Sequence, residues 1–112
     1  ASYQLATEMD ADISLVVVGR MGGFALEDYL GAGLIAGRIP GDVEFADDQA
    51  FWAWRSVKAL EGELESIIQR CEHARELIRS NLGRDVEFCS KIDVFRVVPV
   101  LRGLVVVPLR KF

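Results

Sequence analysis

The stretch from Ile13 to Ile39 constrains the fold more than any other part of the sequence. It begins with ISLVVVG, in which Ser14 is the only polar side chain before the first glycine. Such a run of β-branched residues is typical of a strand that is covered on both faces. A glycine-rich turn follows, and apolar residues take up helical spacing from Phe24 onward. The stretch therefore predicts a buried strand, a tight turn and the start of a helix.

Helical patterns account for much of the remaining chain. Residues 1–11 predict a short helix, and a second helix should run from about Ala25 to Ala36, with Gly37 at its end. From Gln49 to Asn81 apolar side chains recur at heptad-like spacing, which predicts one or two consecutive helices with a possible boundary at Gly62. This apolar seam either packs on the protein's own sheet or forms a coiled coil with a second chain.

The tail of the chain has the alternation of β-strands. Two strand-like runs, 94–101 and 104–109, are joined at Arg102-Gly103, which predicts a β-hairpin. We therefore expect an α/β fold: a layered sheet with a buried central strand, flanking helices that include the long helical segment, and a C-terminal β-hairpin.

Composition argues against several functional classes. The net charge of −4 and the lack of a basic run argue against nucleic-acid binding. Apolar runs fall short of the ~18 residues of a membrane span, and the first residues do not resemble a signal peptide. The two cysteines, Cys71 and Cys89, form no C-x-x-C motif. Buried, reduced thiols in a cytoplasmic protein are the expected state.

The glycine-rich turn is a candidate anion site. Gly19, Gly22 and Gly23 allow a tight turn that leaves backbone N–H groups uncovered, and the helix dipole adds to their attraction for an anion. Arg20 could bind a phosphate or sulfonate in a bidentate manner. The turn lacks the Lys-Ser/Thr ending of a phosphate-loop NTPase and the spacing of a dinucleotide fingerprint.

Two carboxylates in the first turn of the second helix suggest a metal. Glu27 and Asp28 either stabilise the helix dipole or hold Mg²⁺, which would bridge to a phosphate. Adjacent helical residues project about 100° apart, so both are not expected to ligate one ion directly. His73, the only histidine, is either a hydrogen-bonded boundary residue or a catalytic group.

Two blocks of the sequence resemble the C-terminal half of the 2-phosphosulfolactate phosphatase family. They are VVVGRMGGFALEDYLGAGLIAGRI and EHARELIRSNLGRDVEFCSKIDVFRVVPVLRG. In the first block the matching positions are Gly19, Gly22, Phe24, Leu26, Glu27 and Asp28. In the second block they are His73, Arg75, Asp85, Val86, Phe88, Cys89, Asp93, Val94, Val98, Pro99 and Val100. Ala25, Gly31 and Ala74 depart from the pattern, standing where serine, cysteine and glycine, respectively, are usual in the family.

The resemblance implies a Mg²⁺-dependent enzyme that hydrolyses 2-phosphosulfolactate to sulfolactate and phosphate in coenzyme M biosynthesis. Residues 1–112 would form a single α/β domain, the C-terminal half of a two-domain enzyme that is incomplete without its N-terminal domain. The expected site comprises catalytic groups (Glu27, Asp28 and His73), phosphate- or sulfonate-binding groups (Gly19, Arg20, Gly22, Gly23 and Arg75) and metal ligands (Glu27 and Asp28). His73 and Arg75 would either join the site or only stabilise the domain.

Two alternatives remain open at this point. The chain could be a non-catalytic α/β module that forms a homo-oligomer through the helical seam or an exposed sheet edge. It could also be a phosphatase of the same fold that acts on another small phosphorylated acid.

Overall fold

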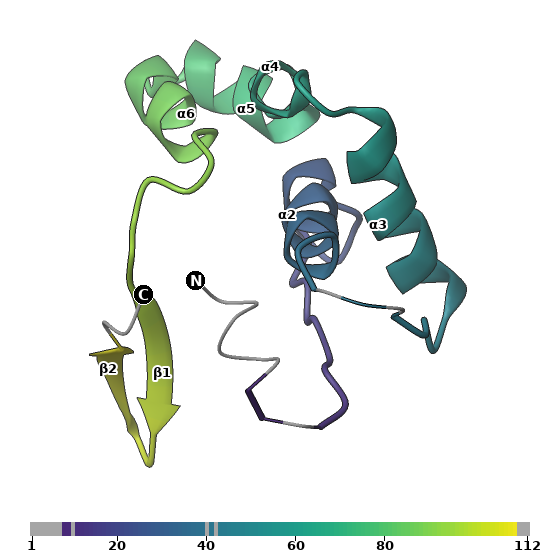
Figure 1. Ribbon diagram of the computed structural model, residues 1–112. Helices are drawn as coiled ribbons and strands as arrows, with labels where there is room; N and C mark the ends of the chain where they lie inside the picture. The colour runs from purple at the N-terminus through teal and green to yellow at the C-terminus, as the bar shows by residue number, and fades with distance from the viewer. Residues whose placement is uncertain (1–7, 10, 40, 42, 110–112) are drawn as a thin grey trace.

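The computed structural model describes residues 8–9, 11–39, 41 and 43–109. Within these residues, five helices are followed by one hairpin, which stands apart from the helices at the end of an extended segment (Figure 1). None of the helices in this part of the chain is long and apolar enough to cross a bilayer. The helix predicted over residues 1–11 falls largely outside the described residues. The elements are α2 (Leu26–Ala36), α3 (Asp48–Ala59), α4 (Leu64–Ile68), α5 (Glu72–Arg79), α6 (Gly83–Cys89), β1 (Val98–Arg102) and β2 (Val105–Leu109).

The predicted buried central strand is not confirmed. Residues 13–18 belong to no strand, and Val16 and Val18 are 85% and 89% exposed. A strand needs a neighbour to accept and donate its backbone hydrogen bonds. Among the described residues, however, the only sheet is the two-stranded pair β1–β2. The layered sheet expected from the sequence is therefore not seen either, and the α/β character rests on the helices and the hairpin.

Helix α2 is the centre of the helical part and follows its predicted bounds, with Gly37 at its C-terminus. Leu30 is 1% exposed and forms the main apolar cluster with Val57 of α3 and Leu64 of α4. Gly33 allows the close approach of α3, because a Cβ at this position would overlap the carbonyl oxygen of Ala53. The lack of a side chain at Gly33 thus permits a tight contact between α2 and α3.

The long helical segment is broken into α3, α4 and α5. Gly62 has a φ of 87°, so the first break lies at the predicted boundary. Asp47 starts α3 by accepting a hydrogen bond from the Ala50 N–H at 2.7 Å. The apolar seam packs within the chain, on α2 and α6 rather than on a sheet, through Val57, Leu64, Cys71 and Ala74. Intramolecular packing of the seam is therefore confirmed, although its partners are helices.

The C-terminal hairpin is also confirmed. Arg102 pairs with Val105, so Gly103 and Leu104 form the turn, and Gly103 has a φ of 62°. A positive φ at the first turn position is typical of a type II′ turn, which fits the twist of the two strands. The same register sets Pro99 directly opposite Pro108.

Candidate functional site

The glycine-rich segment folds into a tight two-residue turn. The N–H and carbonyl groups of Arg20 and Gly23 bond to each other at 3.1 and 2.7 Å. Between them, Met21 and Gly22 have φ values of 50° and 75°, as in a type I′ turn. Gly19 has a φ of 70°, and a Cβ there would overlap the Gly23 carbonyl oxygen. Glycine is therefore required at position 19 by both conformation and space.

The backbone N–H groups of Gly19 and Gly23 are engaged in hydrogen bonds, which corrects the sequence-based expectation for these two glycines. Those of Arg20 and Gly23 close the turn. The N–H of Gly19 donates to Oδ2 of Asp28 at 2.8 Å. Because a carboxylate already neutralises this donor, an anion could use it only after displacing Asp28.

Glu27, the neighbour of Asp28, connects α2 to α5. Its Oε1 lies 2.8 Å from Nδ1 of His73, and its Oε2 accepts a hydrogen bond from the Cys71 thiol at 3.4 Å. Cys71 also starts α5, because its sulfur accepts a hydrogen bond from the Ala74 N–H. Both oxygens of Glu27 are thus engaged, one by His73 of the second sequence block and the other by Cys71, the residue just before that block.

The ionisation of this cluster follows from its contacts. Burial raises the pKa of Glu27, but its own backbone N–H and the hydrogen bonds from His73 and Cys71 outweigh burial and leave the pKa below its ordinary value. Burial raises the pKa of the Cys71 thiol, the hydrogen bonds from the Ala74 and His73 N–H groups oppose that rise, and the contact with Glu27 adds to it. The pair is therefore a carboxylate that accepts a hydrogen bond from a neutral thiol.

Arginine side chains form the remaining polar contacts. Arg20 pairs with Glu76 of α5. The turn and Glu27 of α2 therefore both contact α5. Arg75 instead donates to the backbone carbonyl of Arg70 at 2.7 Å. The structure brings together the turn, Arg20, Glu27, Asp28 and His73 but directs Arg75 to another contact.

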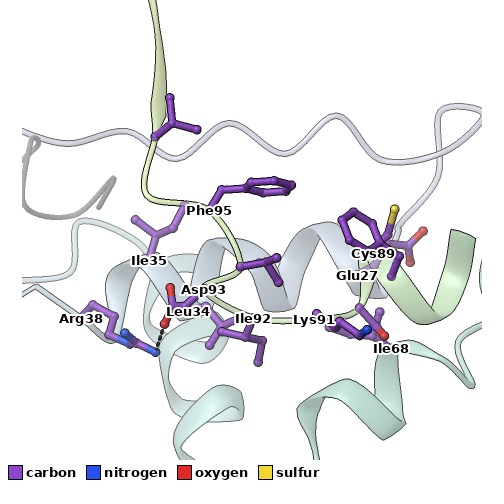
Figure 2. A pocket seen from close by; sticks show the side chains of 15 residues that line it. Glu27, Leu34, Ile35, Arg38, Ile68, Cys89, Lys91, Ile92, Asp93 and Phe95 are labelled. Atoms are coloured by element: carbon purple, nitrogen blue, oxygen red, sulfur yellow. Dashed lines mark ion pairs between the residues drawn. The ribbon is translucent and has the colours of Figure 1, made fainter. Parts of the chain in front are cut away.

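Two hollows flank the first turn of α2. Asp28 lines a hollow of about 720 Å³ beside the turn; its lining also includes Gly19, Gly23, Phe24, Tyr29, Asp48 and Trp52. Glu27 lines a groove of about 520 Å³ between α2 and residues 88–97. Figure 2 shows Glu27 and Cys89 at one end of this groove and the Arg38–Asp93 ion pair at the other. The two adjacent carboxylates thus face different spaces, in keeping with the 100° step of a helix.

The described residues do not by themselves fit a magnesium site. No group of three or more His, Cys, Asp or Glu side chains among them is placed to hold a metal ion. Both oxygens of Glu27 and one oxygen of Asp28 already accept hydrogen bonds. Mg²⁺ prefers six oxygen ligands in octahedral geometry, so most of its ligands would have to come from elsewhere.

Two residues of this cluster were not predicted from the sequence. Both cysteines were expected as buried thiols; Cys71 is buried, but Cys89 is exposed, which corrects that expectation for Cys89. No contact was predicted for Glu76. Each contacts a residue more than 40 positions away: Cys71 lies 44 positions from Glu27, and Glu76 lies 56 from Arg20. Helical spacing places His73 and Glu76 on one side of α5, which was the only available signal.

A comparison with protein families covers both sequence blocks. The family model described as 2-phosphosulpholactate phosphatase matches residues 1–103. The chain belongs to this family. Both sequence blocks lie within the matched range, so the cluster around Glu27 is built from the part of the chain that defines the family.

Curated relatives agree with this assignment. The chain is similar to the "Probable 2-phosphosulfolactate phosphatase" of Thermotoga maritima, with 39% identity over 90 residues, covering 80% of this chain and 39% of the relative. It is also similar to the 2-phosphosulfolactate phosphatase of Methanothermobacter thermautotrophicus, with 32% identity over 104 residues, covering 91% of this chain and 43% of the relative. The chain thus spans about two fifths of the length of these phosphatases. The comparison with solved structures found no match.

Proposed function

We propose that this chain is the C-terminal part of a phosphatase that hydrolyses 2-phosphosulfolactate to sulfolactate and phosphate, in a coenzyme M-like biosynthetic route. The observation that carries the proposal is the contact between Glu27 and His73, with 2.8 Å between Oε1 and Nδ1. It unites a carboxylate of the first family block with the histidine of the second, close to the turn that carries Arg20.

The chemistry required is a balanced hydrolysis. A water oxygen bonds to phosphorus while the bond from phosphorus to the ester oxygen breaks; water loses one proton and the leaving oxygen gains one. His73 would take up the water proton, since its ring is 41% exposed and can accept at one nitrogen. Arg20 would bind the phosphate or the sulfonate, exchanging Glu76 for the substrate anion. Asp28 would keep the turn, including Gly19, Gly22 and Gly23, in shape beside that anion.

Magnesium dependence is part of the proposal and rests on the resemblance alone. When bound, Mg²⁺ would neutralise charge on the phosphate. Asp28 is the better candidate ligand, because both oxygens of Glu27 are engaged by other residues. No step of the reaction is assigned to the ion.

We also propose that this chain needs further polypeptide to complete the site. Support comes from the relatives, of which it spans about two fifths, and from the exposed apolar side chains of residues 13–18. An N-terminal domain that covers this segment would supply the missing polar groups. A second copy of the chain is the alternative partner. A cytoplasmic location suits the free thiols of Cys71 and Cys89.

The test is phosphate release from 2-phosphosulfolactate, with and without Mg²⁺, by a family-length protein that carries this sequence. Wild type is compared with His73→Asn, Asp28→Asn and Arg20→Gln. We expect His73→Asn to lower kcat by about 10²-fold or more, as for loss of a general base. Unchanged turnover in His73→Asn and Arg20→Gln would refute these roles.

The substrate is tested in the same assay with phosphorylated acids in which a carboxylate replaces the sulfonate. A higher kcat/KM for 2-phosphosulfolactate supports the proposal, and a higher value for a carboxylate analogue favours the same-fold alternative. A protein that forms stable oligomers but releases no phosphate from any of these phosphorylated acids would be a non-catalytic module.

A further inference from the structure

A thiol, a carboxylate and an imidazole form one hydrogen-bonded chain between α5 and α2. The Cys71 thiol donates to Oε2 of Glu27, and Oε1 of Glu27 faces Nδ1 of His73. Cys71 is 7% exposed, whereas the His73 side chain is 41% exposed. The chain therefore runs from the interior of the protein to a ring that solvent or a ligand can reach.

The hydrogen-bonding capacity of each group fixes the direction of the chain. An ionised carboxylate only accepts hydrogen bonds, so the proton between Glu27 and His73 must belong to Nδ1. The neutral ring then has its lone pair at Nε2. A ring that carried its proton on Nε2 would turn the lone pair of Nδ1 toward a carboxylate oxygen, which is repulsive.

Cys71 has two tasks in this arrangement. Its sulfur accepts from the Ala74 N–H and so caps α5, the helix that carries His73. Its proton holds the second oxygen of Glu27. One side chain thus sets both the start of the helix that bears the imidazole and the orientation of the carboxylate that the imidazole contacts.

We infer that Cys71 is a positioning residue that acts through Glu27 to keep the proton of His73 on Nδ1 and Nε2 free to accept one. Glu27 would be a positioning residue in the same unit rather than a metal ligand. The inference rests on the proposed function only for the use of Nε2 in phosphate-ester hydrolysis. The tautomer of His73 follows from contacts within this chain alone.

The tautomer can be measured directly, because His73 is the only histidine. Long-range proton–nitrogen NMR correlations on the ¹⁵N-labelled protein, recorded at roughly pH 8, above the ordinary imidazole pKa, show which ring nitrogen carries the proton. We expect Nδ1–H in the wild type. Cys71→Ala should shift the population toward Nε2–H, whereas Cys71→Ser should keep Nδ1–H, because a hydroxyl both donates and accepts. Cys89→Ala is the matched control, since Cys89 is exposed, and should leave the tautomer unchanged.

Three outcomes would overturn the inference: Nε2–H in the wild type, Nδ1–H retained in Cys71→Ala, or the same loss of Nδ1–H in Cys71→Ser and Cys71→Ala. If Cys71→Ala does not fold by circular dichroism, Glu27→Ala decides in its place, because alanine suits α2 and removes the acceptor. Retention of Nδ1–H in Glu27→Ala would then show that Glu27 does not set the tautomer of His73, which would overturn the inference.

A kinetic readout separates this inference from the proposed function. In the family-length enzyme, Cys71→Ala should lower kcat about tenfold with little change in KM, because the variant loses a part of what a general base contributes. Cys71→Ser should have a kcat close to that of the wild type. A wild-type enzyme with no phosphatase activity would refute the proposed function and leave the NMR result standing. An active enzyme whose kcat is the same in Cys71→Ala would refute the positioning role.

Discussion

Arg20 of the glycine-rich turn forms an ion pair with Glu76 of α5, 56 residues further along the chain. Together with the contact between Glu27 and His73, it fastens the start of α2 to α5. Both side chains of the Arg20–Glu76 pair are partly exposed, with 37% and 41% of their surfaces accessible. Water and salt therefore weaken the pair, and an incoming anion can compete for Arg20.

Removing the charge of Glu76 should strengthen anion binding at Arg20. Exposed ion pairs contribute about 0.2–1 kcal/mol, so Glu76→Gln should tighten binding of inorganic phosphate by up to about fivefold at low salt. Isothermal titration calorimetry or NMR titration measures the change. Glu72→Gln removes the same charge from the exposed first turn of α5. Equal effects of the two substitutions would mean that only net charge matters.

Loss of the Asp28 side chain should destabilise the turn. Asp28→Ala leaves the Gly19 N–H without its charged acceptor, at an expected cost of about 1–3 kcal/mol in the free energy of unfolding. Asp28→Asn should cost less because an amide oxygen still accepts. Urea unfolding is the measurement. Asp48→Ala is the control, since Asp48 also lies in the first turn of a helix and loses only its dipole interaction. Equal losses for Asp28→Ala and Asp48→Ala would contradict this prediction.

Two glycines of α2 should respond in opposite directions to alanine. Gly33→Ala places a Cβ against the Ala53 carbonyl oxygen and the Val57 side chain, so it should lower the free energy of unfolding by about 1–3 kcal/mol. Gly31→Ala meets nothing within 4 Å and should raise it by about 0.5–1 kcal/mol through helix propensity. Thermal unfolding of both variants tests the close contact of α2 with α3. A neutral Gly33→Ala would refute that contact.

Acid should weaken the connection between α2 and α5. The pKa of Glu27 lies below its ordinary value of 4.5 in the folded protein, so between the two values the unfolded chain binds more protons at this group. Its stabilising contribution is complete above the ordinary value and is lost as pH falls through the folded value. Unfolding midpoints in urea, measured from pH 6 down to about pH 3, should fall more steeply in the wild type than in Glu27→Gln. Glu61→Gln, at an exposed glutamate, should keep the wild-type slope.

Features set by neighbours in the sequence were predictable. The bounds of α2, the Asp47 cap and the hairpin turn at Gly103 all depend on local propensity, capping or turn chemistry. The break at Gly62 was equally local. The segment 13–18 was misjudged because apolar β-branched residues show only that a strand would be favourable, whereas a partner strand must exist to form it.

The candidate site was predictable by residue but not by role. Sequence placed Glu27, Asp28 and His73 in one site, yet it offered the two carboxylates as metal ligands and the turn N–H groups as free donors. In the structure, hydrogen bonds across 9 to 46 residues engage the Gly19 N–H, Asp28, Glu27 and His73. Such contacts depend on how α2 and α5 are placed relative to each other, which no spacing within one segment reveals.

The register that sets Pro99 opposite Pro108 has a consequence for association of the hairpin. Neither proline has a backbone N–H to donate to the other strand, so the two prolines form a non-hydrogen-bonded pair. At such a pair, the N–H groups of other residues would point away from the partner strand. Each edge of the hairpin consequently lacks one outward donor at the same level. A third strand added on either side would lose a hydrogen bond there, which protects two apolar, exposed strands against open-ended fibril growth.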